Sequence, residues 1–364
     1  MQPLLAEAAP RIEQERALPP DVLAALHAAG MFRLTMPREL DGAEVAPATL
    51  MQITEALAEA DASTAWCVGQ AAGCAVSAAH LSAESARRLF GTPEAVLAWG
   101  AGASGLARPV AGGWRISGRW MFASGLRHST LLGGHCPVAE GPDAPVITFL
   151  FPRTAAQVTD PWRVVGLRGT GSDSYAVDDL FVPEDATLDR AVPAPHPAPL
   201  YRLPLIQLYP GAFGGVALGI ARAMLQSFMA LATEKTPRGL RRPLAQNAAI
   251  QSLLGHSTAR LRAARALLLT TLSEMYAEFE AGGALRSEHA LGIRMASTFA
   301  IQEAVAVADL IYHEAGASAI FDANPFERRL RDIHAVAQQV QGRRANFELV
   351  GQHLLGITDG PLFV

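Results

Sequence analysis

The sequence predicts a mostly helical α+β protein in which a β-rich middle part separates two helical parts. From about Leu200 to the C-terminus, apolar residues recur at the spacing of long helices. Between about Glu94 and Asp185, the pattern changes to the two-residue alternation that is typical of strands. Residues 1–91 consist of helix-forming segments interrupted by a turn cluster. Few architectures place a helical domain, a β domain and a helical bundle in this order.

The composition is that of a well-packed globular protein. The chain has 364 residues, half of them hydrophobic, and a mean hydropathy of +0.18. Charges of both signs are scattered along the chain and sum to −4, so we expect no nucleic-acid or anionic-membrane partner. No apolar run of about 18 residues lacks charges or breakers, which predicts no transmembrane helix. The acidic start, MQPLLAEAAPRIEQER, is not typical of a signal peptide.

The cysteines predict neither a metal centre nor a disulfide framework. Cys67, Cys74 and Cys136 match no metal-binding spacing, and an odd number of cysteines argues against paired bridges. Buried thiols in a reducing compartment explain them. We therefore expect a cytoplasmic protein without a bound metal.

The N-terminal helical domain is predicted over residues 1–92. Two prolines at 19–20 precede the helix-forming segment DVLAALHAAGMF. The tripeptide at 61–63, Asp-Ala-Ser, is expected to cap a helix junction. The helix that follows, from Thr64 to His80, is apolar on nearly every face, which favours a buried position.

The central β domain is predicted over residues 93–190, as an antiparallel barrel or sandwich of about six to eight strands. In GGWRISGRWMFASG, one strand face is expected to hold Trp114, Ile116, Trp120 and Phe122. The apolar run VITFLFP, at 146–152, predicts another strand between two prolines.

The C-terminal part is predicted over residues 201–364, after a proline-rich linker at 191–200. Four long helices are expected, at 211–235, 244–282, 288–317 and 325–341, with a short fifth helix at 346–356. Short connections between them predict an up-down bundle. The fourth helix places Glu327 and Arg331 four residues apart, where their charges can meet.

Four sequence pieces, in this order, carry a resemblance over nearly the full chain. They are ADASTAWCVG, GGWRISGRWMFASGLRHS, GLRGTGSDSYAVDDLFVP and YHEAGASAIFDANPFERRLRDIHA. The chain resembles the acyl-CoA dehydrogenase superfamily, and within it the branch of two-component flavin-dependent monooxygenases. The resemblance implies a helical N-terminal domain, a central β domain and a C-terminal four-helix bundle. It also implies FAD or FMN between the β domain and the bundle, in a homotetramer or homodimer.

The end of the aromatic strand is the first candidate for a flavin site. Trp120 and Phe122 offer an apolar wall, and Ser124 offers a hydroxyl to the flavin edge. Aromatic strand faces more often fill a core, and the residues alone favour that interpretation. The resemblance implies that Ser124 lies near the flavin. Trp99 is a similar candidate.

Loop residues form the second group of candidates. The glycine-rich segment at 168–172 ends in Ser172, which the resemblance places near the active cavity, whereas an ordinary β-turn is the alternative. Among three arginines between two predicted helices, Arg238 is chosen to bind the flavin diphosphate, and a solvated loop is the alternative. The resemblance places Gly316 and Ala317 near the flavin of a neighbouring subunit. His128 could serve as acid, base or donor, although lone histidines are more often structural.

The most specific position of the family is occupied by Gln339. In the monooxygenase branch a histidine usually stands seven residues after the aspartate of the Arg-Asp pair, which here is Asp332. Two helical turns are expected to place Gln339 on the same face as Asp332. A glutamine donates and accepts hydrogen bonds but cannot titrate, so proton transfer by this side chain is excluded.

Three functions remain open from the sequence. The first is a monooxygenase that oxidises a small aromatic, heterocyclic or acyl substrate with reduced flavin. Because no nucleotide-binding GxGxxG follows a predicted strand, the reduced flavin is expected to come from a separate reductase. The second is an acyl-CoA dehydrogenase or flavin oxidase, which the overall order of domains favours. The third is a member that binds flavin without turnover, which Gln339 motivates. Within residues 332–348, no glutamate precedes Glu348, so the dehydrogenase base is not found there.

Overall fold

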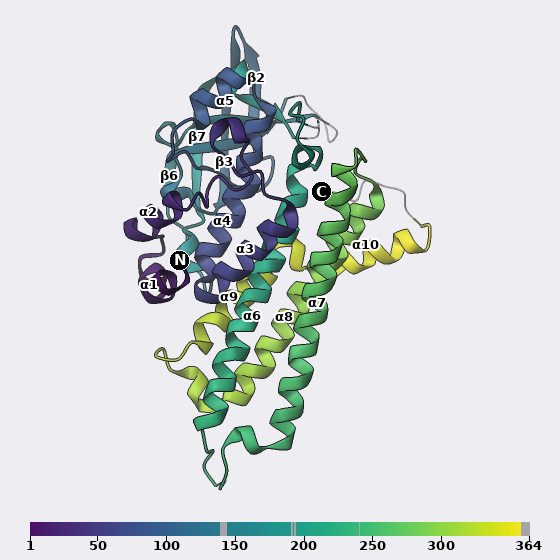
Figure 1. Cartoon of the computed structure of the whole chain (residues 1–364). Helices are drawn as coiled ribbons and strands as arrows, with labels where there is room; N and C mark the ends of the chain where they lie inside the picture. The colour runs from purple at the N-terminus through teal and green to yellow at the C-terminus, as the bar shows by residue number, and fades with distance from the viewer. Residues whose placement is uncertain (139–143, 191, 193, 240, 358–364) are drawn as a thin grey trace.

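The computed structural model describes residues 1–138, 144–190, 192, 194–239 and 241–357. Its N-terminal helices and β domain occupy one end of the molecule, and the long C-terminal helices extend away from them (Figure 1). Helices, with the 3₁₀ helices included, account for 60% of the described residues. The fold is therefore the mostly helical α+β arrangement that the sequence predicts.

The N-terminal part is helical and lies against both other parts. Its helices are α1 (Gln2–Glu15), α2 (Pro20–Ala28), α3 (Pro47–Ala60), α4 (Ala62–Ala75) and α5 (Ala83–Phe90). As expected, Asp61 caps α4, because its carboxylate accepts a hydrogen bond of 2.6 Å from the backbone N–H of Thr64. Nearly every residue of α4 is buried. The α-helix ends at Ala75, and a 3₁₀ helix continues the chain to His80.

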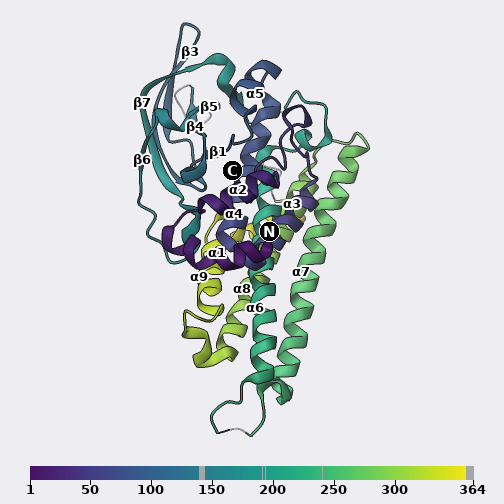
Figure 2. The ribbon, with the colours of Figure 1, turned by 60° about the vertical axis from the view of Figure 1, so that its left-hand side comes forward.

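The β domain consists of two four-stranded sheets that enclose an apolar core (Figure 2). One sheet has the order β1 (Leu97–Trp99), β4 (Leu131–Pro137), β5 (Val146–Pro152), β8 (Thr187–Asp189). The other has the order β2 (Gly105–Val110), β3 (Gly113–Ala123), β7 (Asp173–Pro183), β6 (Gln157–Thr159). All pairings are antiparallel except the parallel pair β1–β4.

The predicted alternation along β3 is wrong at its end. The register between β3 and β7 shifts between Trp120 and Ala123, and Phe122 adopts a φ of +63°. This irregularity reverses the side-chain direction, because an extra residue breaks the period of two. Trp120 is completely buried, whereas 59% of Phe122 is exposed. The two aromatic residues therefore lie on different sides of the sheet.

The C-terminal part is a bundle built around α6. Its helices are α6 (Leu208–Glu234), α7 (Ala248–Glu280), α8 (Ser287–Ala315), α9 (Phe326–Ala337) and α10 (Ala345–Leu354). The long helices α6, α7 and α8 run side by side (Figures 1 and 2). The expected charge pair on α9 is present, with Arg331 Nε 2.8 Å from Glu327 Oε2. The expected extent of α9 is wrong, because the helix ends at Ala337 and not at Gln341.

Two of these helices are long and apolar enough to cross a bilayer. They span Leu205–Glu234 and Ser287–Ile320, and 67% and 50% of their most apolar windows are buried inside the protein. Core helices of a bundle have the same length and composition. Because α6 packs against both α3 and α8, its apolar surface is covered by protein.

Candidate functional site

A cavity of about 760 Å³ lies where the β domain meets the helical parts. Its wall comes from α4, the ends of β1 and β3, the loop at 162–172, the start of α6 and the segment after α9. We call it the interdomain cavity. Its volume is typical of sites for cofactors and drug-sized ligands.

Three hydroxyl groups form a connected cluster on one wall of this cavity. Ser124 Oγ lies 2.7 Å from Ser172 Oγ, which lies 2.7 Å from Thr170 Oγ1. All three side chains are buried. Ser124 follows β3, and the other two flank Gly171, whose φ of +49° turns the loop into β7. We call Ser124, Thr170 and Ser172 the hydroxyl cluster.

The direction of the hydrogen bonds in the hydroxyl cluster follows from its two ends. Trp66 Nε1 donates to Ser124 Oγ over 3.0 Å, and Thr170 Oγ1 donates to the carbonyl of Leu167 over 2.8 Å. Thr170 must then accept from Ser172, and Ser172 from Ser124, because each hydroxyl has one hydrogen. The remaining lone pairs are therefore acceptors for an N–H or O–H group of a ligand.

Stacked aromatic rings form a second wall. Trp66 stacks on Phe213 with ring centroids 3.8 Å apart, and Phe213 stacks on Tyr209 at 5.6 Å. We call Trp66, Phe213 and Tyr209 the ring row. Because Trp66 also donates to Ser124, the ring row begins at the hydroxyl cluster and leads away from it. The parts of these stacked rings that line the cavity are apolar and suit an aromatic ligand.

The predicted aromatic residues have different positions relative to the cavity. Phe122 lines it and makes an edge-to-face contact with Trp162 at 6.1 Å. Trp99 also lines it, with its ring against His135. The prediction that Trp120 contacts the flavin is contradicted, because its side chain is fully buried in the core of the β domain and does not line the cavity.

The reason lies in the packing of Trp120 between the two sheets. Its ring stacks on Tyr175 at 5.3 Å, and its Nε1 donates to the carbonyl of His135 over 3.2 Å. Because of the irregularity at the end of β3, Phe122 lines the cavity and Trp120 does not. The alternative that aromatic strand residues fill the core therefore holds for Trp120.

The prediction of a catalytic His128 is contradicted by its surroundings. The partly buried ring lies 5.2 Å from the ring of Phe32 of the N-terminal helical part, its Nε2 is buried, and it does not line the cavity. Burial and the nearby His27 lower the pKa of His128 to about 3. A histidine that stays neutral, outside the cavity, cannot exchange protons with a ligand there.

Gln339 lines the cavity, although the predicted reason is wrong. It follows the end of α9 in an extended conformation, with φ −81° and ψ 169°, so helical spacing from Asp332 does not place it. Its Nε2 is buried and has no hydrogen-bond partner among the described residues. His334 points elsewhere and pairs with Asp309 at 2.8 Å. Gln339 therefore offers a free donor to a ligand.

The remaining predicted cofactor contacts lie away from the cavity. Arg238 is exposed in the connection between α6 and α7, and Gly316 and Ala317 follow α8. Lys235 ties the two segments together, donating to the carbonyl of Ala315 over 2.6 Å. This connection lies at the end of the bundle farthest from the β domain (Figure 1). Within one chain, therefore, the structure does not bring these residues to the cavity.

Charged side chains in the cavity wall are of one sign only. Arg190 and Arg343 line it, and no aspartate or glutamate of the described residues does. Sequence reasoning missed Arg190, Tyr209 and Trp66. Trp66 is part of the resembling piece ADASTAWCVG, whereas no local pattern marks Arg190, which stands between the last strand and the proline-rich linker.

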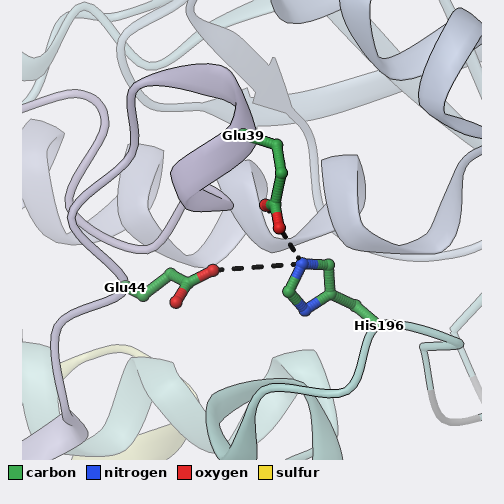
Figure 3. Close-up of side chains that lie close together, drawn as sticks. All are labelled: Glu39, Glu44 and His196. Atoms are coloured by element: carbon green, nitrogen blue, oxygen red, sulfur yellow. Dashed lines mark hydrogen bonds and ion pairs between the residues drawn. The ribbon is translucent and has the colours of Figure 1, made fainter.

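Glu39, Glu44 and His196 form a separate cluster on the surface (Figure 3). His196 Nε2 lies 3.2 Å from Glu39 Oε2 and 3.9 Å from Glu44 Oε1. Its Nδ1 accepts a hydrogen bond from the backbone of Ala198, so Nε2 carries the proton that faces the carboxylates. A protonated nitrogen does not bind a metal, and Arg38 already pairs with Glu44. The cluster therefore ties the linker to the N-terminal part.

Comparison with known proteins agrees with this architecture. The family model described as "Acyl-CoA dehydrogenase, N-terminal domain" matches residues 1–90, and "Acyl-CoA dehydrogenase, C-terminal domain" matches residues 212–342. Indole-3-acetate monooxygenase of Pseudomonas putida is 28% identical over 94% of this chain and 89% of that protein. The oxygenase subunit HsaA, a flavin-dependent monooxygenase of Rhodococcus jostii RHA1, is 28% identical over 92% of this chain and 90% of its own length.

A solved structure is similar throughout. The 3-HSA hydroxylase from Rhodococcus sp. RHA1 superposes with a TM-score of 0.93 at 25% identity, covering all of this chain and 97% of that one. The similarity therefore includes the β domain and the segment after α9, which the two family models leave partly unmatched.

Proposed function

The chain belongs to the acyl-CoA dehydrogenase superfamily, and from this membership we propose that it is the oxygenase component of a two-component flavin-dependent monooxygenase. One observation carries the choice between oxygenase and dehydrogenase. No carboxylate of the described residues lines the interdomain cavity. Removal of the α-proton of an acyl thioester needs a base, and neither Gln339 nor the hydroxyl cluster supplies one near neutral pH.

The cavity residues fit a flavin. The ring row and Phe122 provide flat apolar surfaces, and the hydroxyl cluster provides acceptors for ring N–H groups. A reduced flavin carries a ring N5–H that the oxidised form lacks, so these acceptors favour the reduced form. When bound, the reduced flavin supplies the electrons that activate dioxygen.

The chain's own residues then position and shield the reactants. Trp66 orients Ser124 by donating to its oxygen, and Thr170 anchors the hydroxyl cluster to the backbone of Leu167. The amide of Gln339 is free to donate a hydrogen bond and does not titrate, so it can orient a ligand but cannot transfer a proton. The aromatic walls exclude water from the site.

An aromatic substrate and a separate flavin reductase complete this proposal. The relatives named above oxidise indole-3-acetate or are oxygenase subunits, which supports a planar substrate beside the flavin and a second protein as the source of reduced flavin. Assembly into a homotetramer would give Arg238, Gly316 and Ala317 access to the flavin of a neighbouring subunit. Light scattering of the purified protein measures that state directly.

Isotope transfer tests the proposed reaction. Purified protein is supplied with chemically reduced FAD or FMN, a panel of phenols and indoles, and ¹⁸O₂, and the products are analysed by mass spectrometry. One ¹⁸O atom in a product is expected, and the preferred flavin identifies the cofactor. Bleaching of bound flavin by acyl-CoA thioesters without air, together with no ¹⁸O incorporation, would instead identify a dehydrogenase.

A further inference from the structure

Arg190 is a partly buried cation, with no ion pair among the described residues, in the wall of the interdomain cavity. It follows β8 and lines the cavity, and its Nε is buried without a hydrogen-bond partner. Among the described residues, it forms no hydrogen bond and no ion pair. An unpaired charge away from bulk water is unfavourable, and such groups normally bind a partner. The partner of Arg190 is therefore expected to enter from the cavity.

The groups around Arg190 cannot neutralise it. Burial raises the pKa of Tyr209 well above its usual range and that of Cys74 to about 12, and it lowers the pKa of His135 well below its usual range. All three are therefore neutral near pH 7. Asp189, the preceding residue, attracts Arg190 electrostatically. Burial lowers the pKa of Arg190 itself, yet a guanidinium keeps its proton near neutral pH.

The position of Arg190 separates it from the hydroxyl cluster. It lies among Tyr209, Cys74 and His135, at the far end of the ring row from Ser124. Tyr209 also receives a weak hydrogen bond from Gln70 Nε2, at 3.4 Å. Arg343, the other cation of the wall, is exposed. A ligand that lies along the ring row would thus have one end at the hydroxyl cluster and the other at Arg190.

We propose that Arg190 binds the carboxylate of the substrate, so that this chain acts on planar aromatic acids. The proposal rests on the monooxygenase function proposed above. A guanidinium donates two parallel hydrogen bonds to a carboxylate, and the ring row accommodates the attached ring. A flavin phosphate has similar oxyanion chemistry. The position of Arg190 beside Tyr209, at the end of the ring row, favours the substrate, and the exposed Arg343 is the second cation of the wall that a phosphate could meet.

Binding of matched acid and amide pairs tests this proposal. The probes are benzoate, phenylacetate and indole-3-acetate, each with its neutral amide, and the affinities are measured by calorimetry on the full-length protein with and without FAD or FMN. At least one acid is expected to bind about 10- to 100-fold more tightly than its amide, as befits hydrogen bonds to a charged group. In Arg190→Gln that preference is expected to vanish because the acid binds more weakly, while the amide keeps its affinity.

Two controls separate the alternatives. Arg343→Gln is expected to keep the acid preference, and Arg190→Gln is expected to melt no lower than the wild type, because an unpaired buried charge is removed. An unchanged acid preference in Arg190→Gln, or weaker FAD or FMN binding as its only effect, would overturn the proposal in favour of a flavin phosphate. So would a wild type that never binds an acid more tightly than its amide. Incorporation of ¹⁸O into any phenol or indole of the panel, acidic or neutral, is measured separately and decides the monooxygenase proposal by itself.

Discussion

The Asp332 carboxylate accepts a hydrogen bond of 2.6 Å from the backbone N–H of Leu167, and this bond joins helix α9 to the loop that forms one wall of the cavity. Leu167 has a φ of +52°, a conformation that L-residues rarely adopt. Its carbonyl in turn accepts from Thr170 of the hydroxyl cluster. Arg331 of α9 also donates to the carbonyl of Val165 over 2.7 Å, so the bundle holds the loop beside the hydroxyl cluster through two neighbouring residues.

The buried carboxyl group of Asp332 predicts a pH-dependent stability. Burial raises its pKa to about 7, whereas the pKa of an aspartate in an unfolded chain is about 3.9. The folded protein thus binds more protons between these values, so the free energy of unfolding falls as the pH rises through this window. One group contributes at most about 1.4 kcal/mol per pH unit. Asp332→Asn is expected to flatten the dependence measured by urea unfolding from pH 5 to pH 8.

Asp41→Asn is the matched control for this experiment. Asp41 is exposed and has a φ of +57°, which asparagine tolerates well. It is expected to leave the pH dependence of the free energy of unfolding unchanged. An equal slope in Asp332→Asn and wild type would contradict a raised pKa at Asp332.

The close approach of Gly166 to α9 predicts that this position accepts no side chain. A Cβ atom there would lie 2.1 Å from the carbonyl oxygen of Arg331. Gly166→Ala is expected to push the loop away from α9, to lower the free energy of unfolding by about 1–3 kcal/mol and to weaken flavin binding. Gly255→Ala is the control, because nothing lies within 4 Å of its new Cβ on α7. It is expected to stabilise the protein by about 0.5–1 kcal/mol. Equal free energies of unfolding of the two variants would show that the loop at Gly166 can move away from α9 without cost.

The order of the three parts and most helices could be predicted because they depend on local patterns. Apolar spacing marked α6, α7 and α8, and an aspartate at the junction marked the start of α4. The monooxygenase branch of the superfamily was recognised from pieces that lie in α4, β3, β7 and the segment from α8 to α9. These features require no knowledge of what packs against them.

The errors arose where a distant partner decides the local geometry. The irregularity in β3 depends on its pairing with β7, and so the sequence of β3 alone assigned Trp120 and Phe122 to one face. No glycine or proline stands between Ala337 and Gln341, so the local sequence predicts a longer helix than the one that forms. Gly342 fits there without a side chain, since a Cβ would lie 2.4 Å from the carbonyl oxygen of Ala337. His128 and Arg190 likewise acquire their surroundings only through tertiary packing.

The direction of the hydrogen bonds in the hydroxyl cluster predicts that a change at Ser124 affects reduced flavin more than oxidised flavin. Ser124→Ala removes an acceptor and is expected to weaken binding of reduced flavin about 5- to 10-fold, the value of one hydrogen bond. Oxidised flavin, with one fewer ring N–H, is expected to lose less. Anaerobic fluorescence titration measures both affinities. Thr258→Ala, which removes an exposed hydroxyl on α7, is expected to change neither. Equal losses for both redox states would contradict the acceptor role.

The free donor of Gln339 predicts opposite effects on stability and on catalysis. Gln339→Leu removes a buried Nε2 that has no partner among the described residues, so the variant is expected to melt no lower than the wild type. The same change removes a hydrogen bond to a bound ligand, and kcat/KM for oxygenation is expected to fall about tenfold.

Gln339→His distinguishes a positioning role from a proton-transfer role. An imidazole retains an N–H donor at this position but has a pKa of about 6.5, whereas the amide does not titrate. If Gln339 only positions a ligand, the variant recovers part of the activity lost in Gln339→Leu and gains a pH dependence near that value, which the wild type lacks at this position. A lower melting temperature with unchanged kcat/KM in Gln339→Leu would show instead that the amide supports the segment after α9 and takes no part in the reaction.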